Sequence, residues 1–288
     1  MVANEISKIA VLGSGTMGNG IAQVCATNGL DVRMQDVETS FLERGEAAIH
    51  KSLGRLVKAG KLDDGQVEQI TGRITVTTDR DAAVDGVDLV IEAIPEDLDL
   101  KQEVFADLDE KTPEHAILAS NTSNFSITAI ASATKRPDRV IGMHWFNPAP
   151  VMKLIEIVRG VDTSDDTVSA IERASEQLGK ESVVCKDAQG FITTRAVIAL
   201  TCEALRMLEE GVASKEDIDK AIRLGLNHPM GPLELGDLTG LDTTLHVADA
   251  MSETYGERFL PSNTLRNLVR AGHYGRKTGR GVYDYDDS

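Results

Sequence analysis

Residues 8–36 read KIAVLGSGTMGNGIAQVCATNGLDVRMQD, and the central GSGTMG, residues 13–18, decides the fold. The run before it is short, apolar and rich in β-branched side chains, which is typical of a buried strand. Apolar residues then recur at helical spacing: Met17, Ile21, Val24 and Cys25. The pair Asn28-Gly29 is a helix-ending pattern, and a second strand-like run, DVRMQDV, follows it. A strand, a glycine turn, a helix and a strand within about 30 residues predict a βαβ unit and hence a parallel sheet.

The glycine turn has the GxGxxG spacing of a dinucleotide-binding fingerprint. We expect Gly13 to permit the tight turn, Gly15 to let the backbone approach a pyrophosphate, and Gly18 to let helix and strand pack closely. Asp36 ends the second strand about 20 residues further on, where its carboxylate would accept hydrogen bonds from an adenosine ribose and repel a 2′-phosphate. The pattern therefore predicts NAD in preference to NADP, although FAD uses the same kind of turn. The residues predicted to contact the cofactor within the turn are Gly13, Gly15, Thr16, Met17 and Gly18.

Strand and helix patterns alternate along the chain as far as residue 187. Helices are expected over residues 39–60, after Asp63, over 98–111, near Ile127 and over 167–178, and strands at ITVTT, VDLVIEAI, AILASN, RVIGMHWF, MKLIEIV and SVVCKD. From Gly190 the alternation ends, and the pattern stays helical to about Ala271. We therefore expect an α/β fold, with a Rossmann-type dinucleotide-binding domain over residues 1–187 and an all-α domain over residues 188–288.

Composition limits the possible partners of the chain. Its 288 residues carry a formal net charge of −16, with a pI near 4.8. This balance argues against nucleic acid or an anionic membrane as a general partner. The same excess of acid would keep a protein soluble in concentrated salt, so a salt-loving host is a hypothesis. No apolar run approaches the roughly 18 residues of a membrane span, and we expect no signal or transit peptide before the first strand.

The cysteines and histidines show no metal-binding pattern. Cys25, Cys185 and Cys202 lie far apart without CxxC spacing, which is typical of buried thiols in a reducing compartment. We therefore expect a cytoplasmic protein. Apart from His144, the histidines have no ligand-like spacing with cysteine or acidic residues, and no metal is expected.

The stretch IGMHWFNPAP, residues 141–150, places His144 beside the only tryptophan of the chain. In the next apolar run, MKLIEIV, a period of two puts Glu156 on the same face as Leu154 and Val158. A buried carboxylate needs a cation or a strong donor close to it. If the two strands are neighbours, Glu156 can orient the imidazole of His144 and stabilise its protonated form. Such a base suits a dehydrogenase, which removes a hydroxyl proton as hydride leaves the same carbon; a purely structural pair is the alternative.

Six motifs follow one another along the chain: GxGxMGxxIA, IEAIPEDLDLK, ASNTSN, GMHWFNPAPVMKLIEIV, GFI..R and HPMGPLELGDLTGLD. Together they resemble the 3-hydroxyacyl-CoA dehydrogenase family, and most of all its short-chain, stand-alone type, which includes bacterial 3-hydroxybutyryl-CoA dehydrogenases. The likeness covers almost the whole chain, through the GRKTGRGVYDY tail. It is specific because the motifs occur in the family's order.

The resemblance implies NAD-dependent, reversible oxidation of an L-3-hydroxyacyl-CoA to a 3-ketoacyl-CoA. It implies that His144 is the catalytic base and Glu156 its partner. It further implies that Ser123, within SNTSN, binds the hydroxyl of the substrate. From its position alone, Ser123 would be interpreted as a helix N-cap.

Three more positions match functional residues of the family. The resemblance places Asn147 near nicotinamide and substrate, and it places Glu96 and Lys101 in contact with NAD. From position alone, Asn147 would be a turn residue and the other two would begin a solvated helix.

One position departs from the family pattern. The family usually has an asparagine before the arginine of GFI..R, where it lines the substrate pocket, and this chain has Thr194. Threonine is shorter and offers a hydroxyl in place of an amide, so the rate or the preferred acyl chain can differ. A bridging water is one way to replace the missing amide.

Coenzyme A carries several negative charges, so a chain at −16 needs a local positive field to bind it. Lys51, Arg55 and Lys58, here called the basic stripe, lie at i, i+4 and i+7 of an expected helix and so share one face. The resemblance points to the same region, where Ser52 and Lys58 are at or next to CoA-contacting positions. The alternative for these charges is a solvated helix face.

Two other functions stay open. A lambda-crystallin-like L-gulonate 3-dehydrogenase would keep the hydride transfer but act on a free hydroxy acid, and the basic stripe would then be incidental. A non-catalytic NAD-binding protein would keep the fold alone; the His144–Glu156 pair argues against it and Thr194 is in its favour. The resemblance also implies a homodimer formed through the helical domain.

Overall fold

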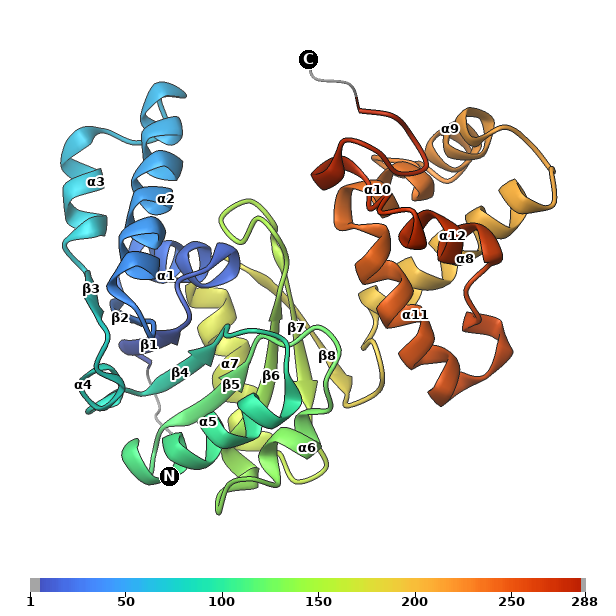
Figure 1. Cartoon of the computed structure of the whole chain (residues 1–288). Helices are drawn as coiled ribbons and strands as arrows, with labels where there is room; N and C mark the ends of the chain where they lie inside the picture. The colour runs from blue at the N-terminus through green and yellow to red at the C-terminus, as the bar shows by residue number, and fades with distance from the viewer. Residues whose placement is uncertain (1–5, 286–288) are drawn as a thin grey trace. The chain divides into compact units, whose positions relative to one another are not determined.

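The computed structural model describes residues 6–285. The chain divides into two compact units, residues up to Ala188 and residues from Gln189 onward. Figure 1 shows that the first unit carries a sheet between helices and that the second is built of helices.

An eight-stranded sheet in the order β3-β2-β1-β4-β5-β6-β7-β8 forms the centre of the first unit. Its strands are β1 (Lys8–Leu12), β2 (Asp31–Gln35), β3 (Ile74–Thr77), β4 (Leu89–Glu92), β5 (Ile117–Ser120), β6 (Val140–Trp145), β7 (Leu154–Arg159) and β8 (Glu181–Lys186). The chain moves outward from β1 through β2 to β3, then returns to β4 on the other side of β1. This reversal of strand order is the topological switch point, where open α/β sheets bind their ligands.

The last two strands, β7 and β8, contradict the expectation of a parallel sheet. β7 runs antiparallel to β6, whereas all the other pairs in the sheet, including β7 with β8, are parallel. The segment 146–153 that joins β6 to β7 is shorter than the dozen or so residues that a parallel crossover needs. The chain therefore doubles back on itself, and β7 lies directly beside β6.

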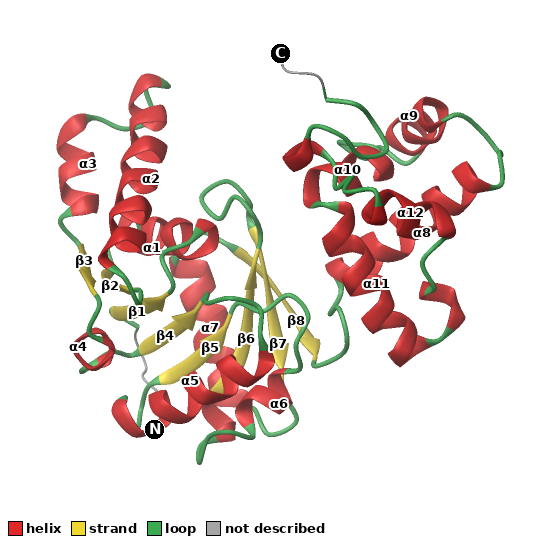
Figure 2. Cartoon of the chain, in the orientation of Figure 1, coloured by secondary structure: helices red, strands yellow, loops and turns green. Residues whose placement is uncertain are grey.

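Helices cover both faces of the sheet, as the red and yellow elements of Figure 2 show. They are α1 (Thr16–Thr27), α2 (Thr39–Lys58), α3 (Asp64–Thr71), α4 (Arg80–Val84), α5 (Leu98–Lys111), α6 (Ile127–Ala131) and α7 (Asp165–Gln177). The short α4 was not expected from the sequence. Its N-terminus is capped by Asp79, which accepts from the backbone N–H groups of Asp81 and Ala82.

Alternate residues of β6 and β7 face opposite sides of the sheet. Met143, Ile155 and Ile157 belong to the hydrophobic core that the strands share with α1 and α7. His144 and Glu156 therefore point to the opposite face, the side on which α6 packs against β6.

The second unit consists of α8 (Thr193–Glu209), α9 (Lys215–Gly225), α10 (Pro232–Thr239), α11 (Leu241–Tyr255) and α12 (Asn263–Arg270). One 3₁₀ turn (Glu257–Phe259) lies between α11 and α12, and another (Arg276–Thr278) follows α12. Two apolar clusters hold α8 to its neighbours, one with α11 and one with α9, α10 and α12. The buried carboxylate of Asp237 accepts hydrogen bonds from the backbone of Val282 and Tyr283, and so anchors the tail of the chain. Within residues 6–285, no helix combines the length and the apolar character needed to cross a membrane.

Candidate active site

The glycine turn joins β1 to α1 at the carboxyl edge of the sheet. A Cβ at Gly13, where φ is +92°, would lie 2.5 Å from the carbonyl oxygen of Ala93, and a Cβ at Gly18 would lie 1.7 Å from that of Gly13. The fold itself therefore excludes a side chain at these two positions. A Cβ at Gly15 would meet no described atom within 4 Å, so this side of the turn is open to a ligand. No side chain of the described residues caps the N-terminus of α1, whose N–H groups can bind a phosphate.

Asp36 follows β2 directly, and its carboxylate lies against the glycine turn. Its Oδ2 accepts hydrogen bonds from the backbone N–H and the hydroxyl of Ser14, at 2.8 and 2.6 Å. Its Oδ1 accepts from the N–H of Val37 at 2.8 Å. Because an ionised carboxylate has about four acceptor sites, room remains for a ribose hydroxyl.

His144 and Glu156 occupy directly opposed positions of the antiparallel pair β6–β7. The Nδ1 of His144 lies 2.8 Å from Oε2 of Glu156, and both side chains are buried. A carboxylate can only accept, so Nδ1 carries a proton and Nε2 keeps a lone pair in the neutral ring. The pair expected from the sequence is therefore formed, and it presents a base at Nε2.

Ser123 lies beside Nε2 of His144. Its Oγ is 3.0 Å from Nε2 of His144. The loop after β5 that carries Ser123 is tied to β6, because the side chain of Asn121 accepts a hydrogen bond from the N–H of Trp145 at 2.9 Å. Residues of two strands and of the loop after β5 thus form one line, from Glu156 through His144 to Ser123.

A second polar network supports this loop from the side of β4. Oε1 of Glu96 accepts hydrogen bonds from the N–H of Ser123, at 3.1 Å, and from the hydroxyl of Thr122. Its other oxygen lies 3.2 Å from Nζ of Lys101. Lys101 is only 1% exposed, and its Nζ also lies 2.6 Å from Oε1 of the buried Glu92, the last residue of β4. The two residues expected to contact NAD are therefore connected to the loop that carries Ser123.

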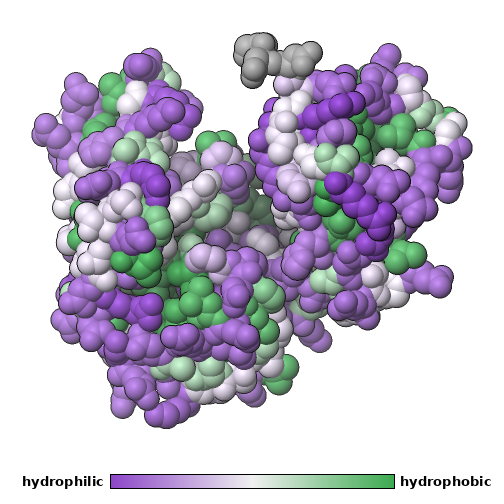
Figure 3. Space-filling model, viewed as in Figure 1, coloured by the Kyte–Doolittle hydropathy of each residue, from purple (hydrophilic) through white to green (hydrophobic). Residues whose placement is uncertain are grey.

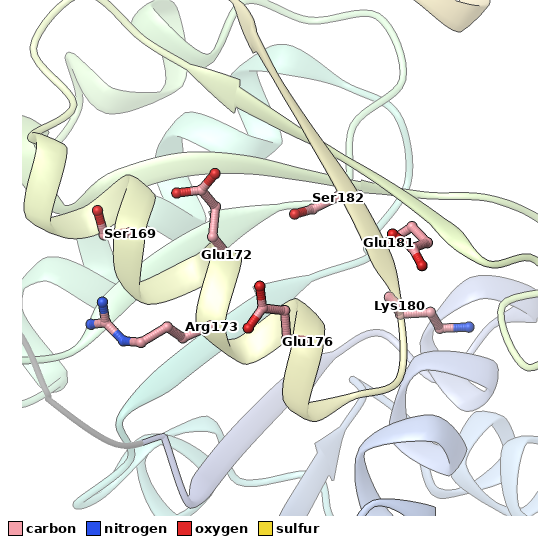
Figure 4. Close-up of a pocket in the computed structure, with 7 residues that line it drawn as sticks. All are labelled: Ser169, Glu172, Arg173, Glu176, Lys180, Glu181 and Ser182. Carbon is pink, nitrogen blue, oxygen red and sulfur yellow. The ribbon is translucent and has the colours of Figure 1, made fainter.

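Asn147 is exposed on the segment between β6 and β7, beyond the strand end that carries His144. Its peptide bond to Pro148 is cis. Nζ of the nearly buried Lys180 donates to the carbonyl oxygens of Ala149 and Met152, both at 2.7 Å, and thereby holds this segment. Lys180 is also one of the residues that line the pocket in Figure 4, where its side chain points away from the carboxylates of α7.

The basic stripe lies on the second half of α2. Lys51, Arg55 and Lys58 are exposed, on the side of α2 opposite to its buried residues, and Ser52 is half-buried. Figure 1 shows that this end of α2, together with α3, projects from the sheet. Thr194 belongs to the first turn of α8 in the second unit, and its place in the substrate pocket stays a prediction.

Comparison with known proteins identifies the family. Residues 8–188 match the model of the 3-hydroxyacyl-CoA dehydrogenase NAD binding domain, and residues 190–285 match that of the C-terminal domain of the same family. The chain belongs to the 3-hydroxyacyl-CoA dehydrogenase family. A probable 3-hydroxybutyryl-CoA dehydrogenase of Deinococcus radiodurans is 46% identical over 96% of this chain and 100% of the relative. The 3-hydroxybutyryl-CoA dehydrogenase of Clostridioides difficile is 44% identical, over 97% of this chain and 99% of that one.

A solved structure agrees with these relatives. The (S)-3-hydroxybutyryl-CoA dehydrogenase of Ralstonia eutropha superposes with a TM-score of 0.95 at 44% identity, covering 98% of this chain and 100% of its own. The predicted family, the fold class and the NAD cofactor of this 3-hydroxyacyl-CoA dehydrogenase are thus confirmed. The roles of its individual residues remain predictions.

The sequence interpretation missed three polar residues of this dehydrogenase site. Glu92 is the partner of Lys101, Thr122 holds Glu96, and Ser14 holds Asp36. A carboxylate that ends the apolar run VDLVIE is a detectable sign of a buried charge, and so could have drawn attention to Glu92. Ser14 occupies an unspecified position of GxGxxG, and nothing in the pattern distinguishes it.

Proposed function

We propose that this dehydrogenase interconverts short L-3-hydroxyacyl-CoA and 3-ketoacyl-CoA thioesters with NAD, with 3-hydroxybutyryl-CoA as the preferred hydroxyacyl substrate, in fatty-acid or butanoate metabolism. The family and the names of its relatives support the substrate class. The observation that carries the proposal is the position of His144, held between Ser123 at 3.0 Å and Glu156 at 2.8 Å.

The chemistry follows from these two contacts. The glycine turn and Asp36 would hold NAD, which would supply the acceptor for the hydride that leaves C3 of the substrate. The substrate hydroxyl donates to Nε2 of His144, which takes its proton, and the hydroxyl of Ser123 donates to the substrate oxygen. Glu156 stabilises the imidazolium through Nδ1–H, so the proton transfer does not leave an unpaired charge in a buried place. We further propose that Asn147 aligns the reacting groups.

Ser123, His144 and Glu156 also have the spacing of a hydrolase triad. Hydrolysis needs N–H groups near the serine to stabilise an oxyanion. The N–H of Ser123 donates to Glu96, and those of Asn124 and Phe125 donate to Oγ1 of Thr122 at 3.2 and 2.9 Å. Because these N–H groups are engaged within the loop, the geometry favours binding of a hydroxyl over nucleophilic attack by Ser123.

Several contacts to the substrate belong to the same proposal. The basic stripe and Ser52 supply a positive surface for the phosphates of coenzyme A. Thr194 replaces an amide with a hydroxyl in the acyl pocket. Glu96 and Lys101, which are joined to each other and to the loop that carries Ser123, belong to the proposed NAD site.

We also propose a cytoplasmic homodimer. The location is supported by the cysteines, because the three of the chain form no disulfide. Burial raises the pKa of the Cys25 thiol to about 12, so this thiol stays protonated. In the second unit, Leu224 and Leu226 near the end of α9 are 68% and 59% exposed, as expected of an apolar surface that a second copy covers. Light scattering of the intact protein tests the dimer, because a monomer near 31.0 kDa would contradict it.

Oxidation of NADH by acetoacetyl-CoA, followed by absorbance, tests the function. The wild-type protein should turn over acetoacetyl-CoA, and free keto and hydroxy acids should be poorer substrates by kcat/KM. His144→Asn and Glu156→Gln should each lower kcat by about 10²–10⁴-fold, because they remove the base or its orienting partner. A protein that binds NADH but never oxidises it with the thioester would be a non-catalytic member of the family. A protein that prefers free hydroxy acids would instead be of the gulonate dehydrogenase kind.

A further inference from the structure

Ser14 and Asp36 meet because β1 and β2 end side by side. Leu12 pairs with Gln35, and the N–H of Gly13 donates to the carbonyl of Gln35 at 2.8 Å. Ser14 and Asp36 are the next residues of the two chains beyond the sheet. The two donors of Ser14, its N–H and its hydroxyl, both reach Oδ2 of Asp36.

The hydroxyl of Ser14 adds a third donor to a carboxylate that two backbone N–H groups also reach, that of Ser14 on Oδ2 and that of Val37 on Oδ1. At 2.6 Å it is the shortest of the three contacts, so its loss would loosen the terminal torsion of Asp36, which is broad for aspartate in general. Together, the three donors occupy two acceptor sites on Oδ2 and one on Oδ1. Asp36 is only half-buried, so its remaining acceptor site is held open towards solvent.

The surroundings of Ser14 keep its side chain in place. Ser14 is 2% exposed, and helix α2 packs on it at Gly45. A Cβ at Gly45 would lie 2.9 Å from the carbonyl oxygen and 3.0 Å from Cβ of Ser14. A bulkier residue than serine would therefore collide with α2, whereas alanine or glycine would fit but would lose the hydroxyl.

We propose that Ser14 is a positioning residue for cofactor selection, whose hydroxyl holds the Asp36 carboxylate in the orientation that accepts a free adenosine ribose and repels a 2′-phosphate. The proposal deepens the proposed function at its cofactor site, and it rests on NAD binding, which the family match supports. It does not depend on which acyl thioester reacts. Serine is neutral, so it cannot offset the negative charge that excludes the phosphate.

Direct binding measurements test this role without any turnover. The dissociation constants of NADH and NADPH are measured by fluorescence titration for the wild type, Ser14→Ala and Ser14→Gly. Loss of the hydroxyl should raise Kd for NADH about fivefold to tenfold, the effect of one hydrogen bond. Kd for NADPH should stay unchanged or fall, so the preference for NADH decreases by at least the same factor. On an Asp36→Asn background, Ser14→Ala should change Kd for NADH less than about twofold, because the charge that Ser14 orients is already gone.

Ser7 provides a matched control at the other end of β1. Its N–H and hydroxyl donate to Oδ2 of Asp88 at 2.9 and 3.1 Å, in the same arrangement but away from the glycine turn. Ser7→Ala should leave both dissociation constants within about twofold of the wild type. If Ser14→Ala weakens NADH and NADPH equally, or changes neither, the proposal is wrong and Ser14 only shapes the turn. Thermal unfolding of each variant shows that binding is compared between folded proteins. If acetoacetyl-CoA were not reduced at all, these binding outcomes would still decide the role of Ser14.

Discussion

The imidazole of His144 is oriented by the carboxylate of Glu156, which is 12 positions away in the sequence and directly opposite in the sheet. Both side chains project from strands whose register is fixed by backbone hydrogen bonds, so the distance between imidazole and carboxylate is set by rigid elements. Ser123, in contrast, stands on a loop, and it is held by the network of Glu96 and Thr122. The proposed base is thus positioned by the sheet, and the residue proposed to bind the hydroxyl is positioned by side chains.

Thr194 stands where the family resemblance leads us to expect an asparagine. Thr194→Asn restores an amide, which can donate and accept at the same time, so kcat/KM for acetoacetyl-CoA should stay unchanged or rise by up to about fivefold, the effect of one hydrogen bond. Steady-state kinetics of NADH oxidation measures the change. Thr254→Asn, at an exposed position of α11 in the same unit, is the control and should have no effect. A fall of more than about tenfold for Thr194→Asn would show that the pocket has adapted to the threonine.

Some residues of the site could be predicted from the sequence because they lie within local patterns. Asp36 follows from its spacing after GxGxxG, and Glu156 follows from the period of two in a strand. Ser14 and Thr122 could not be predicted, since each acts through a partner on a different segment that only the fold brings close. Glu92 carries a signal of its own, a carboxylate at the end of an apolar run, but its partner Lys101 lies on α5 and is not identified by spacing. Serine and threonine in loops are common, and their hydrogen-bonding partners are not encoded by spacing.

At the scale of elements, the segment between β6 and β7 is held in place by hydrogen bonds from Lys180. The ammonium group of Lys180 donates to two carbonyl oxygens of the segment that carries Asn147, and its Nζ lies 5.5 Å from the centre of the Trp145 ring. Lys180→Met should lower kcat for acetoacetyl-CoA about tenfold, because Asn147 is no longer held. It should also lower the free energy of unfolding by about 1–3 kcal/mol, because the buried carbonyl of Ala149 and the partly buried carbonyl of Met152 lose their donor. Steady-state kinetics and denaturant unfolding measure the two effects.

The control for Lys180 lies on the same segment. Lys153 is exposed, and Lys153→Met removes the same charge without removing a buried donor, so it should change neither quantity. In a double-mutant cycle, Lys180→Met should add little to the kcat loss of Asn147→Ala. Fully additive losses would mean that Lys180 does not act through Asn147.

Helix α2 is the element on which the binding of coenzyme A is proposed. Arg55→Glu combined with Lys58→Glu should raise KM for acetoacetyl-CoA about tenfold or more and leave Kd for NADH unchanged, because the stripe faces solvent at the projecting end of α2. The control, Lys135→Glu with Arg173→Glu, makes the same change in net charge at exposed positions elsewhere in the unit. An equal rise of KM in both variants would assign the effect to overall charge, and no rise in either would remove the stripe from the site.

The strongly patterned elements agree with their predictions, and the deviations have local causes. α5 begins and ends as expected at Leu98 and Lys111, whereas α2 ends at Lys58, before Gly60 with its φ of +66°. α7 begins at Asp165, earlier than expected, because Ser164 accepts from the N–H of Thr167 and caps it. The direction of β7 was not predictable from periodicity, which is the same for parallel and antiparallel strands.

At the scale of the whole molecule, acidic charge is the dominant feature. The chain has 46 acidic residues against 30 lysines and arginines, and hydrophilic residues cover much of the face seen in Figure 3. Repulsion among like charges opposes the compact state and is felt by all parts of the surface. The basic stripe is proposed to attract an anionic thioester against this background. Salt screens its local field, which therefore acts only over a short range.

Salt should therefore stabilise the protein at neutral pH. Raising KCl from about 10 mM to 1 M shortens the Debye length from about 30 Å to about 3 Å, which screens the repulsion at a net charge of −16. A gain of about 1–2 kcal/mol would raise Tm by roughly 2–8 °C, measured by thermal unfolding at pH 7.5.

The control is the same salt titration near pH 4.8, the pI of the chain, where the net charge is close to zero and only the general effect of salt on apolar surface remains. The rise of Tm at pH 7.5 should exceed that at pH 4.8, and an equal response at both would show that surface repulsion does not limit stability. A response that is confined to neutral pH and continues to molar salt would also support the hypothesis of a salt-loving host.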